Sequence, residues 1–388
     1  MQKQTNNTTT KQPLTPTLRF PQFTEQWEEK KLGEVATFFS GGTPLTTNRS
    51  YFEGTIPFIR SGEINSDKTE QFISEEGLKK SSAKMVEKGD LIFALYGATS
   101  GEVGISKIKG AINQAILCIR TENNTRYIMN WLATNKDNIL NKYLQGGQGN
   151  LSAEIIKLLP IPLPSLPEQQ KIADFLSAVD EKLQALKKKK HLLEQYKKGI
   201  MQQIFTQTLR FKDEQGNDFP EWEERKLGEV AEIATGASNR EDSVLNGEYT
   251  FFDRSQDIRT SNRYLFDKEA IIVPGEGREF IPKYFIGKFD LHQRTYAVFD
   301  FKNTNGKFLF YYITFNDKHL LSQAVGTTVK SLRLPMFESM PISLPSLPEQ
   351  QKIATFLSAL DEKINYAQEE ITKIALWKKG LLQQLFPQ

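Results

Sequence analysis

Two stretches of the chain repeat apolar residues every three or four positions, the spacing that lines one face of a long helix. The first stretch, from about Leu166 to Phe205, has its apolar positions at Leu176, Val179, Leu183, Leu186, Leu193 and Ile200. The second has them at Leu357, Leu360, Ile364, Ala367, Ile371, Ile374 and Leu381. The pattern predicts two long helices packed together. At 1.5 Å per residue the first helix is about 60 Å long, too long to be covered by one small domain.

Polar residues also fall on the apolar seam of the first helix, at Lys190 and Lys197. A polar residue at such a position tends to fix the register of a helix pair. Each helix follows a proline-rich turn, and Ser165–Glu168 and Ser346–Glu349 both match a capping box with proline in the first turn. The sequence therefore predicts where both helices start, with serine and glutamate side chains capping the first turn.

The helix starts belong to a segment that occurs twice. "LPSLPEQQKIADFLSAVDEKL" at Leu163–Leu183 returns 181 residues later as "LPSLPEQQKIATFLSALDEKI", with 18 of 21 positions identical. "WEEKKLGEVA" at Trp27–Ala36 returns as "WEERKLGEVA" from Trp222, and "YKKGIMQQIF" at Tyr196–Phe205 returns as "WKKGLLQQLF" from Trp377. Helix periodicity does not dictate eleven identical residues that include turn prolines. A duplicated frame predicts a pseudo-two-fold molecule that presents one surface twice.

The segments between the repeated motifs differ in sequence and in length. From Ala36 to Pro164, β-type runs such as "TIPFIRSGEI", "GDLIFALYG" and "AINQAILCIR" alternate with Gly/Ser/Thr loops, and a predicted helix "RYIMNWLATNKDNILNKYL" follows. This is an α+β pattern. The second segment aligns with the first when Gly97 is placed over Gly277, so we expect one shared fold with different side chains.

Polar residues stand where the predicted strands end. The alignment places Arg60-Ser61 over Arg254-Ser255 and Asn113-Gln114 over His292-Gln293, and these residue types hydrogen-bond to base edges and phosphates. Matching loops at 146–150 and 326–330 suit phosphates through their backbone N–H groups. Solubilising surface residues and simple turns are the alternative interpretation. The candidate DNA contacts are Arg60, Ser61, Asn113, Gln114, Arg254, Ser255, His292, Gln293 and Lys330.

Composition narrows the class of protein. The 388 residues are 38% hydrophobic and 25% charged, as in ordinary globular proteins, and the net charge of +3 permits a nucleic-acid partner without requiring one. A single cysteine, Cys118, excludes an internal disulfide and a structural zinc cluster, and three dispersed histidines count against a catalytic metal site. The chain lacks an apolar run of about 18 residues and a signal peptide, so we expect a cytoplasmic protein with no membrane contact.

Catalytic motifs are missing as well. "GATSGEVG" at Gly97–Gly104 has neither the Gly-Lys-Ser/Thr of a phosphate loop nor the G-x-G-x-x-G spacing. The sequence contains no Asp/Asn-Pro-Pro-aromatic tetrapeptide of an amino-methyltransferase and no nucleophile elbow. We therefore expect the chain to carry out no chemistry by itself.

Together these features resemble the specificity subunit of type I restriction-modification systems. The resemblance rests on two variable domains, the duplicated "LPSLPEQQKIA" turn that leads into a long helix, and the "KLGEVA" motif, in the same order in both halves. "SGGTP" at Ser40–Pro44 with "IPFIRSGEI" looks like the start of a target-recognition domain of that family. The second half has "TGASNRED" at Thr235–Asp242 instead, which implies that the two domains read different sequences.

The resemblance implies a role within a complex. In that family the specificity subunit recognises double-stranded DNA, two modification subunits methylate adenine from S-adenosylmethionine, and restriction subunits add ATP-dependent translocation and cleavage. S-adenosylmethionine, ATP and Mg are thus expected on partner subunits, with no cofactor in this chain. The duplicated frame would offer two equivalent docking places, for which the candidate partner-binding residues are Leu176, Leu183, Leu357 and Ile364. The expected DNA target is bipartite, asymmetric and gapped.

The expected fold is α+β, with two target-recognition domains related by pseudo-two-fold symmetry and separated by two long antiparallel coiled-coil spacer helices. Its segments are a disordered tail at 1–17, recognition domain 1 at 18–164, spacer helix 1 at 165–205, recognition domain 2 at 206–345 and spacer helix 2 at 346–388. Two other functions are weighed against this one. A coiled-coil scaffold with two protein-binding heads would not bind DNA, and a fused methyltransferase or nuclease would carry a cofactor motif.

Overall fold

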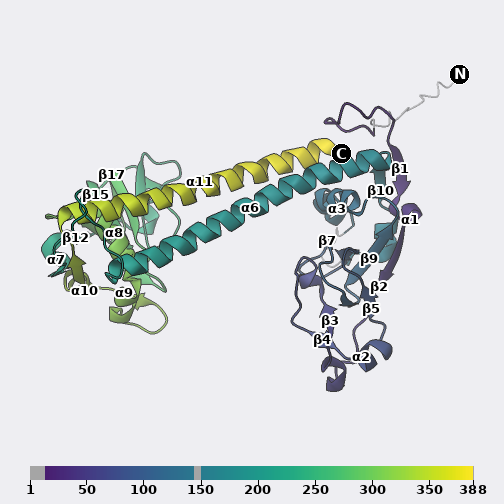
Figure 1. Ribbon diagram of the computed structural model, residues 1–388, viewed down its shortest axis with the longest axis horizontal. Coiled ribbons are helices and arrows are strands. Elements are labelled where there is room, and N and C mark those ends of the chain that lie inside the picture. The colour runs from purple at the N-terminus through teal and green to yellow at the C-terminus, as the bar shows by residue number, and fades with distance from the viewer. Residues whose placement is uncertain (1–13, 144–149, 388) are drawn as a thin grey trace. The chain divides into compact units, whose positions relative to one another are not determined.

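The computed structural model describes residues 14–143 and 150–387 (Figure 1). They form two compact units, of which the first holds Met1–Ala185 with Ile371–Gln388 and the second holds Leu186–Glu370. Each unit has a mixed α/β head, as the alternation of runs and loops predicts. Two long helices, α6 (Leu166–Phe205) and α11 (Leu347–Leu385), each contribute one part to each unit.

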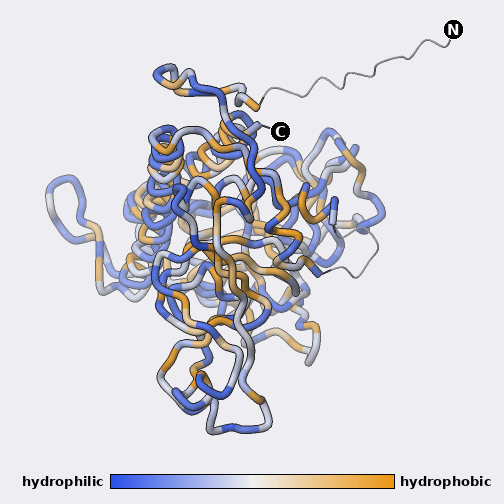
Figure 2. The backbone as a smooth tube through the Cα atoms, turned by 90° about the vertical axis from the view of Figure 1, so that its right-hand side faces the viewer, coloured by the Kyte–Doolittle hydropathy of each residue, from blue (hydrophilic) through white to orange (hydrophobic). Residues whose placement is uncertain are grey.

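The head of the first unit contains two four-stranded sheets, with strand orders β2-β9-β6-β7 and β4-β3-β8-β5, and a two-stranded ladder of β1 and β10. Its strands are β1 (Glu28–Lys31), β2 (Ala36–Ser40), β3 (Ile56–Ile59), β4 (Phe72–Ile73), β5 (Lys84–Val86), β6 (Leu91–Ala94), β7 (Val103–Ile105), β8 (Gly110–Ile112), β9 (Ile116–Thr121) and β10 (Pro160–Leu163). Its helices are α1 (Leu32–Val35), η1 (Arg49–Phe52), η2 (Ser61–Glu63), α2 (Glu75–Lys79), α3 (Thr125–Thr134), α4 (Lys136–Tyr143) and α5 (Ala153–Lys157). In Figure 2 the hydrophobic stretches lie mainly along the central strands, and the peripheral loops are mainly hydrophilic.

The head of the second unit contains one six-stranded sheet, β12-β18-β15-β17-β13-β14, and two two-stranded ladders, β11-β20 and β16-β19. Its strands are β11 (Glu223–Lys226), β12 (Glu232–Thr235), β13 (Tyr249–Phe252), β14 (Arg259–Ser261), β15 (Phe266–Pro274), β16 (Glu276–Gly277), β17 (Lys283–Leu291), β18 (Thr295–Phe299), β19 (Lys330–Ser331) and β20 (Pro341–Leu344). Its helices are α7 (Leu227–Val230), η3 (Arg240–Asp242), α8 (Gly306–Phe315), α9 (Asp317–Gln323) and α10 (Leu334–Glu338).

The predicted helix "RYIMNWLATNKDNILNKYL" is two helices in the structure. Asn135 ends α3, where its backbone N–H bonds to Trp131 and Ala133, and α4 starts at the next residue. Asparagine tolerates this cap conformation better than the helix interior. The second head has the same break between α8 and α9 at Asn316.

The glutamate of the predicted capping box has a different role. The buried Glu168 carboxylate accepts hydrogen bonds from Arg19 Nε and Nη2, both at 2.8 Å, and from Trp27 Nε1 at 3.2 Å. The capping-box prediction is therefore wrong, because a buried carboxylate needs a charged partner more than a helix end needs a cap. At the second helix start, Ser346 Oγ has no hydrogen-bond partner in the described part of the chain.

The second unit repeats this arrangement. Glu349, with no exposed surface, accepts from Arg210 Nε at 3.3 Å, Arg210 Nη2 at 3.1 Å and Trp222 Nε1 at 3.2 Å. Both arginines belong to a tetrapeptide "TLRF" that also occurs twice, at 17–20 and 208–211. The buried carboxylate thus links three repeated motifs in each unit: TLRF, the tryptophan of "WEE", and "LPEQQ".

The two glutamines that follow the glutamate hold the head against the helix. Gln169 Oε1 accepts from the backbone N–H of Asn124 at 3.0 Å, and Gln170 Oε1 accepts from the Asn124 side chain at 2.7 Å. Asn124 itself caps α3. Gln350 and Gln351 hold Asn305, the cap of α8, in the same way at 2.8 Å each. We call these contacts of Glu-Gln-Gln the joint of each unit.

The long helices pair within each unit, where their segments run antiparallel (Figure 1). In the first unit, Asp180 of α6 pairs with Lys378 of α11 at 2.6 Å. In the second, Asp361 of α11 pairs with Lys197 of α6 at 2.5 Å. The two aspartates are equivalent in the repeat, and so are the two lysines. The other polar seam residue, Lys190, pairs with Glu194 on its own helix at 3.2 Å.

The predicted tail spans residues 1–17, of which 1–13 lie outside the described residues. Residues 14–17 contact the first unit: Leu14 packs against the hydrophobic core and Thr17 Oγ1 donates to the carbonyl of Gln384 at 3.3 Å. No helix among the described residues is long and apolar enough to span a membrane.

Exchange of charge tests the helix pairing. We expect Asp180→Lys to destabilise the protein by on the order of 1 kcal/mol, because it places a lysine against Lys378 in a half-exposed pair. Adding Lys378→Asp should restore most of the loss, measured by urea unfolding as a double-mutant cycle. The same cycle at Asp361 and Lys197 is the matched test, and absence of rescue in both cycles would contradict the pairing.

Removal of the buried carboxylate tests the joint. Glu168→Ala leaves the largely buried Arg19 without its partner, so we expect a loss of about 3 kcal/mol in the free energy of unfolding. Glu87→Ala, which breaks the exposed pair with Lys109, is the control and should cost less than about 1 kcal/mol. Equal losses in the two variants would show that Glu168 is not a structural centre.

Candidate nucleic-acid interface

The candidate residues lie at the ends of two adjacent parallel strands in each head. In the first, β3 pairs with β8 in parallel, with Ile59 level with Ile112, so Arg60 and Asn113 leave the sheet side by side. In the second, β13 pairs with β17 in parallel, with Phe252 level with Leu291. Parallel neighbours end at the same edge of a sheet. The fold therefore brings Arg60-Ser61 next to Asn113-Gln114, and Arg254-Ser255 next to His292-Gln293.

In each head a glycine packs directly against the last residue of one of these two strands. An added Cβ at Gly41 would lie 1.8 Å from the carbonyl oxygen of Ile112, and one at Gly236 would lie 1.7 Å from that of Leu291. Only a residue without a side chain permits this close approach. The loop that follows then reaches the candidate glutamines: Thr43 Oγ1 donates to Gln114 Oε1 at 2.6 Å, and Gln293 Nε2 donates to Asn239 Oδ1 at 2.5 Å.

In the first head, carboxylates position the candidate arginine. Arg60 Nη2 donates to Glu63 at 3.2 Å and to Glu70 at 2.9 Å, and the Arg60 side chain stays 39% exposed. Burial opposes ionisation of Glu63, but its hydrogen bonds with Arg60 and neighbouring backbone groups prevail and lower its pKa. Asn113 Oδ1 accepts from the backbone of Ala115 at 3.1 Å, which turns its side chain back on its own loop.

In the second head, one carboxylate holds two arginines. Arg254 Nη1 donates to Glu276 Oε2 at 2.6 Å, and Arg294 Nη1 donates to Glu276 Oε1. Burial opposes ionisation of Glu276, but the bonds from Arg294 and Arg254 prevail and lower its pKa. The two guanidinium groups, 49% and 58% exposed, are thus fixed side by side with one positive charge in excess.

A second buried carboxylate shapes the loop after β13. Asp253 accepts from Ser255 N at 2.7 Å, Ser255 Oγ at 2.5 Å and Arg259 Nε at 2.9 Å. Lys283 Nζ donates to the Ser255 carbonyl at 2.9 Å, and burial lowers the pKa of this lysine. The Ser255 side chain therefore makes its hydrogen bond within its own loop. The guanidinium of the neighbouring Arg254 instead pairs with Glu276 near the surface.

His292 is buried, with 8% of its surface exposed. Its Nδ1 accepts from the backbone N–H of Arg294 at 3.0 Å. Burial, followed by the positive charge of Arg254, lowers the pKa of the imidazole, so it is neutral at pH 7. His292 therefore positions the backbone of Arg294. Of the two candidates His292 and Gln293, only Gln293 is exposed.

Lys330 lies near the same edge of the second head, although it comes from β19, late in the sequence of that head. It pairs with Gly277 in the ladder of β16 and β19, next to Glu276, and its Nζ donates to the carbonyl of Leu321 at 3.3 Å. The corresponding loop of the first head, at 146–150, lies outside the described residues except for Asn150.

Sequence reasoning missed the charged residues that organise the second edge. These are Asp253, Arg259, Glu276 and Arg294, together with Arg263, whose Nη2 donates to Ser238 Oγ at 2.6 Å and to Asp242 at 3.1 Å. They are spread over 42 positions of the sequence, and the strand pairing brings them together. Asp253 and Arg294 had a local signal, because Asp253 directly precedes the candidate Arg254-Ser255 and Arg294 directly follows the candidate His292-Gln293.

The candidate partner-binding residues lie mainly inside the units. Leu176 and Leu357 have no exposed surface and belong to the two hydrophobic cores, while Leu183 and Ile364 are half-buried. The pairing of α6 with α11 and with the heads uses their apolar surface, so Leu176 and Leu357 are not available to another protein in this structure.

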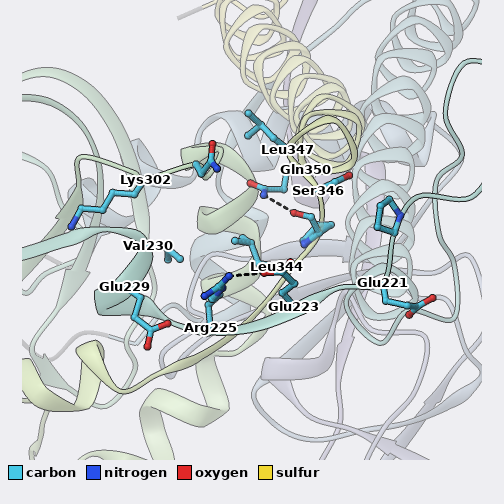
Figure 3. A pocket seen from close by; sticks show the side chains of 13 residues that line it. Glu221, Glu223, Arg225, Glu229, Val230, Lys302, Leu344, Ser346, Leu347 and Gln350 are labelled. Carbon is cyan, nitrogen blue, oxygen red and sulfur yellow. Dashed lines mark hydrogen bonds and ion pairs between the residues drawn. The ribbon is translucent and has the colours of Figure 1, made fainter.

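A polar groove lies where the second head meets the start of α11 (Figure 3). It has a volume of about 410 Å³ and is lined by Arg225, Glu229, Lys302 and Gln350, among others. Arg225 pairs with Glu223 at 2.7 Å, and Lys302 pairs with Glu232 at 2.6 Å. Its charged groups are therefore largely satisfied within the chain, and the described residues hold no group of three or more His, Cys, Asp and Glu that could bind a metal ion.

The fold and its duplicated frame define the class of protein. The chain belongs to the family of the type I restriction modification DNA specificity domain, whose model matches residues 24–195 and 220–376, one match in each half.

Individual relatives are similar to this chain over nearly its whole length. The MjaIX specificity subunit of a type I restriction enzyme from Methanocaldococcus jannaschii is 25% identical, over 93% of each chain. The MjaVIII specificity subunit of the same organism is 26% identical, over 95% of this chain and 93% of that one. The crystal structure of a type I restriction-modification S subunit from M. genitalium has a TM-score of 0.66 at 16% identity, over 96% of this chain and 99% of that one. This likeness confirms the fold with two recognition domains.

Closure of the strand ends can be tested at the glycines. We expect Gly41→Ala and Gly236→Ala to lower the free energy of unfolding by on the order of 1–3 kcal/mol, because the added Cβ would overlap a backbone carbonyl. Gly62→Ala, where a Cβ would meet nothing within 4 Å, is the matched control and should be near neutral. Thermal unfolding of the three variants decides the point; equal melting temperatures would contradict the close approach.

Proposed function

We propose that this chain is the sequence-recognition subunit of a type I restriction-modification complex and reads a bipartite, asymmetric and gapped target in double-stranded DNA. The observation that carries the proposal is the repeated strand-end edge, at which guanidinium, amide and hydroxyl groups leave two adjacent parallel strands in each head. Arginine forks suit guanine O6 and N7, and glutamine amides suit adenine N6 and N7.

An asymmetric target follows from the differences between the two edges. The first presents Arg60, held by Glu63 and Glu70, beside Gln114. The second presents Arg254 and Arg294 on one carboxylate, beside Gln293. Different donors at equivalent places on one scaffold would read different bases. The two heads therefore account for two different half-sites.

The carboxylates keep the arginines ready for exchange. Glu70 is 84% exposed, and an ion pair at such a site contributes only about 0–1 kcal/mol, so Arg60 can turn from Glu70 to a guanine edge or a phosphate at small cost. Glu276 is only 13% exposed but holds two arginines, so one of them can leave while the carboxylate keeps the other. Glu276, whose pKa is lowered, stays ionised at neutral pH and holds both forks in the free protein. Pre-ordered side chains reduce the entropy lost on binding.

The remaining parts of the proposal concern the complex. The long helices would act as an antiparallel coiled-coil spacer between the half-sites, and the duplicated frame would receive two modification subunits, with restriction subunits added to that core. A structural neighbour described by the complex assembly and conformational transition of the type I system has a TM-score of 0.57 at 17% identity, over 93% of this chain. That likeness in fold is compatible with such an assembly. S-adenosylmethionine, ATP and Mg would be bound by the partners.

The proposal predicts that each head controls one half of a methylated motif. The chain is co-expressed with its modification subunit, and N6-methyladenine is mapped over the host genome by single-molecule sequencing. We expect one gapped motif, methylated on both strands. Arg254→Ala or Gln293→Ala should relax or abolish one half only, because one bidentate base contact is worth about 1–3 kcal/mol, or about 5- to 150-fold in preference.

Arg225→Ala is the control, because this exposed arginine lies in the repeated frame rather than at the strand-end edge. It should leave both halves of the motif unchanged. An unaltered motif in Arg254→Ala and Gln293→Ala would remove these residues from the interface, and a wild-type complex without any motif would overturn DNA recognition itself.

A further inference from the structure

The second head buries a carboxylate just before one of its candidate strand ends. Asp290, in β17, has no exposed surface and lies two residues before His292. Its Oδ1 accepts from Ser238 Oγ at 2.5 Å and from the backbone N–H of Leu291 at 2.9 Å, and its Oδ2 accepts from Arg263 Nε at 3.4 Å. A buried carboxylate without such partners would be strongly destabilising. Asp290 therefore holds Ser238 and Arg263 in place.

The corresponding position of the first head is apolar. Asp290 is the next-to-last residue of β17, and its equivalent in β8 is Ala111. Ala111 is buried in an apolar cluster with Phe58 and Ile73. An ion pair at such a place costs more desolvation than an apolar side chain does. The buried charge is therefore a feature in which the second head departs from the first, and it lies next to the edge at which the two heads differ.

Ser238 joins this carboxylate to the loop that follows β12. Its side chain donates to Asp290 and accepts from Arg263 Nη2 at 2.6 Å. Its backbone N–H donates to the carbonyl of Leu291 at 3.1 Å, and its carbonyl accepts from the backbone N–H of Gln293 at 2.9 Å. The side chain and the backbone of this one residue thus tie the loop to the end of β17. Gln293 follows the same strand end, so the loop and this candidate base contact share one anchor.

Arg263 extends the hydrogen bonds to Asn239. Its Nη2 also donates to Asp242 Oδ2 at 3.1 Å, and the same oxygen accepts from the backbone N–H of Asn239 at 2.7 Å. Asn239 is exposed, and its Oδ1 accepts from Gln293 Nε2 at 2.5 Å. The bonds therefore connect a buried carboxylate to the amide of an exposed glutamine. We call Asp290, Ser238, Arg263 and Asp242 the Asp290 network.

The bond to Asn239 fixes which way the Gln293 amide faces. One N–H of Nε2 is held by Asn239, so the other N–H and Oε1 are left for a ligand among the described residues. Adenine offers the complementary pair in the major groove, since its N6 donates and its N7 accepts. An amide that rotated freely would lose part of this preference, because ordering it on binding would cost entropy.

We propose that the Asp290 network positions Asn239 and thereby fixes Gln293 to read an adenine in the half-site of the second head. This inference rests on the proposed function, which supplies the DNA. The members of the network act through Asn239, so they are positioning residues rather than base contacts. The first head holds Gln114 by its amide oxygen instead of its nitrogen, which agrees with a different base at that place.

Two substitutions of Asn239 test the orientation of the amide. The full chain is co-expressed with its modification subunit, and N6-methyladenine is mapped over the host genome. The preference is the methylated fraction of sites with adenine, divided by that of sites with another base, at the position that Gln293→Ala relaxes. Asn239→Ala should lower this preference about fivefold, as expected for the loss of one hydrogen bond.

The conservative variant and a control complete this part of the test. Asn239→Asp keeps an oxygen that accepts from Gln293, so it should keep the preference, although its added charge should slow methylation at every site alike. Asn262→Ala changes an exposed asparagine of the same head that lies outside the network, and it should leave the motif unchanged.

Two further variants test the buried part of the network. Arg263→Ala leaves the Asp290 carboxylate without its cation, so the melting temperature should fall by about 5 °C or more. Adding Asp290→Asn removes the uncompensated charge and keeps an acceptor for Ser238, so most of that loss should be recovered. Both variants release Asn239 from the network and should relax the same base position, while the half read by the first head stays unchanged.

The outcomes separate this inference from the proposed function. An unchanged motif in Asn239→Ala, or in the folded double variant, would overturn the role of the network while leaving DNA recognition intact. An unchanged motif in Gln293→Ala, or a base other than adenine at the position that it relaxes, would do the same. A wild-type complex that methylates no motif would overturn both the inference and the proposed function.

Discussion

The buried glutamate of each joint is the interaction on which the rest of the structure depends. Glu168 and Glu349 are almost completely removed from water, and a lone carboxylate in such a place would be strongly destabilising. Each is therefore tied to an arginine fork and an indole N–H that come from two other parts of the chain. One charged group fixes the helix start, the first segment of the head and the tryptophan that opens the frame, which explains why these motifs recur together.

The joint lies in the repeated motifs, whereas the strand-end edges that differ between the heads lie outside it. The two glutamines after the glutamate hold the cap of a head helix, so the head is oriented by side chains that do not belong to its strand-end edge. The edge can then change without loss of the fold. In the first head β5 and β6 are separate strands, with Gly89 in the left-handed region at the turn between them, whereas in the second β15 is one continuous strand. Even this rearrangement keeps the parallel pair that presents the candidate residues.

The sequence was sufficient for features that depend on local pattern or on repetition. The helix seams, the helix starts, the duplicated frame and the polar strand ends all follow from spacing within a few residues or from identity between the halves. It was insufficient wherever two distant side chains compete for one partner. The capping box at Glu168 was a reasonable local prediction, but Arg19, 149 positions away, takes the carboxylate. Glu276 was missed for the same reason, since its two arginines come from different strand ends. Leu176 and Leu357 were assigned to a partner because periodicity identifies an apolar face without saying what covers it.

The ion pairs between the long helices join the two copies of the frame. Asp180 of the first copy pairs with Lys378 of the second, and Asp361 of the second pairs with Lys197 of the first. Each unit is thus completed by residues from the other half of the gene product. A charge change in one copy damages a contact with the other copy, and only a matching change there repairs it. Each strand-end edge, by contrast, is packed against a glycine of its own head and held by carboxylates of its own head. A substitution at one strand-end edge is therefore local to that head, whereas a charge change in these pairs of the long helices involves both copies of the frame.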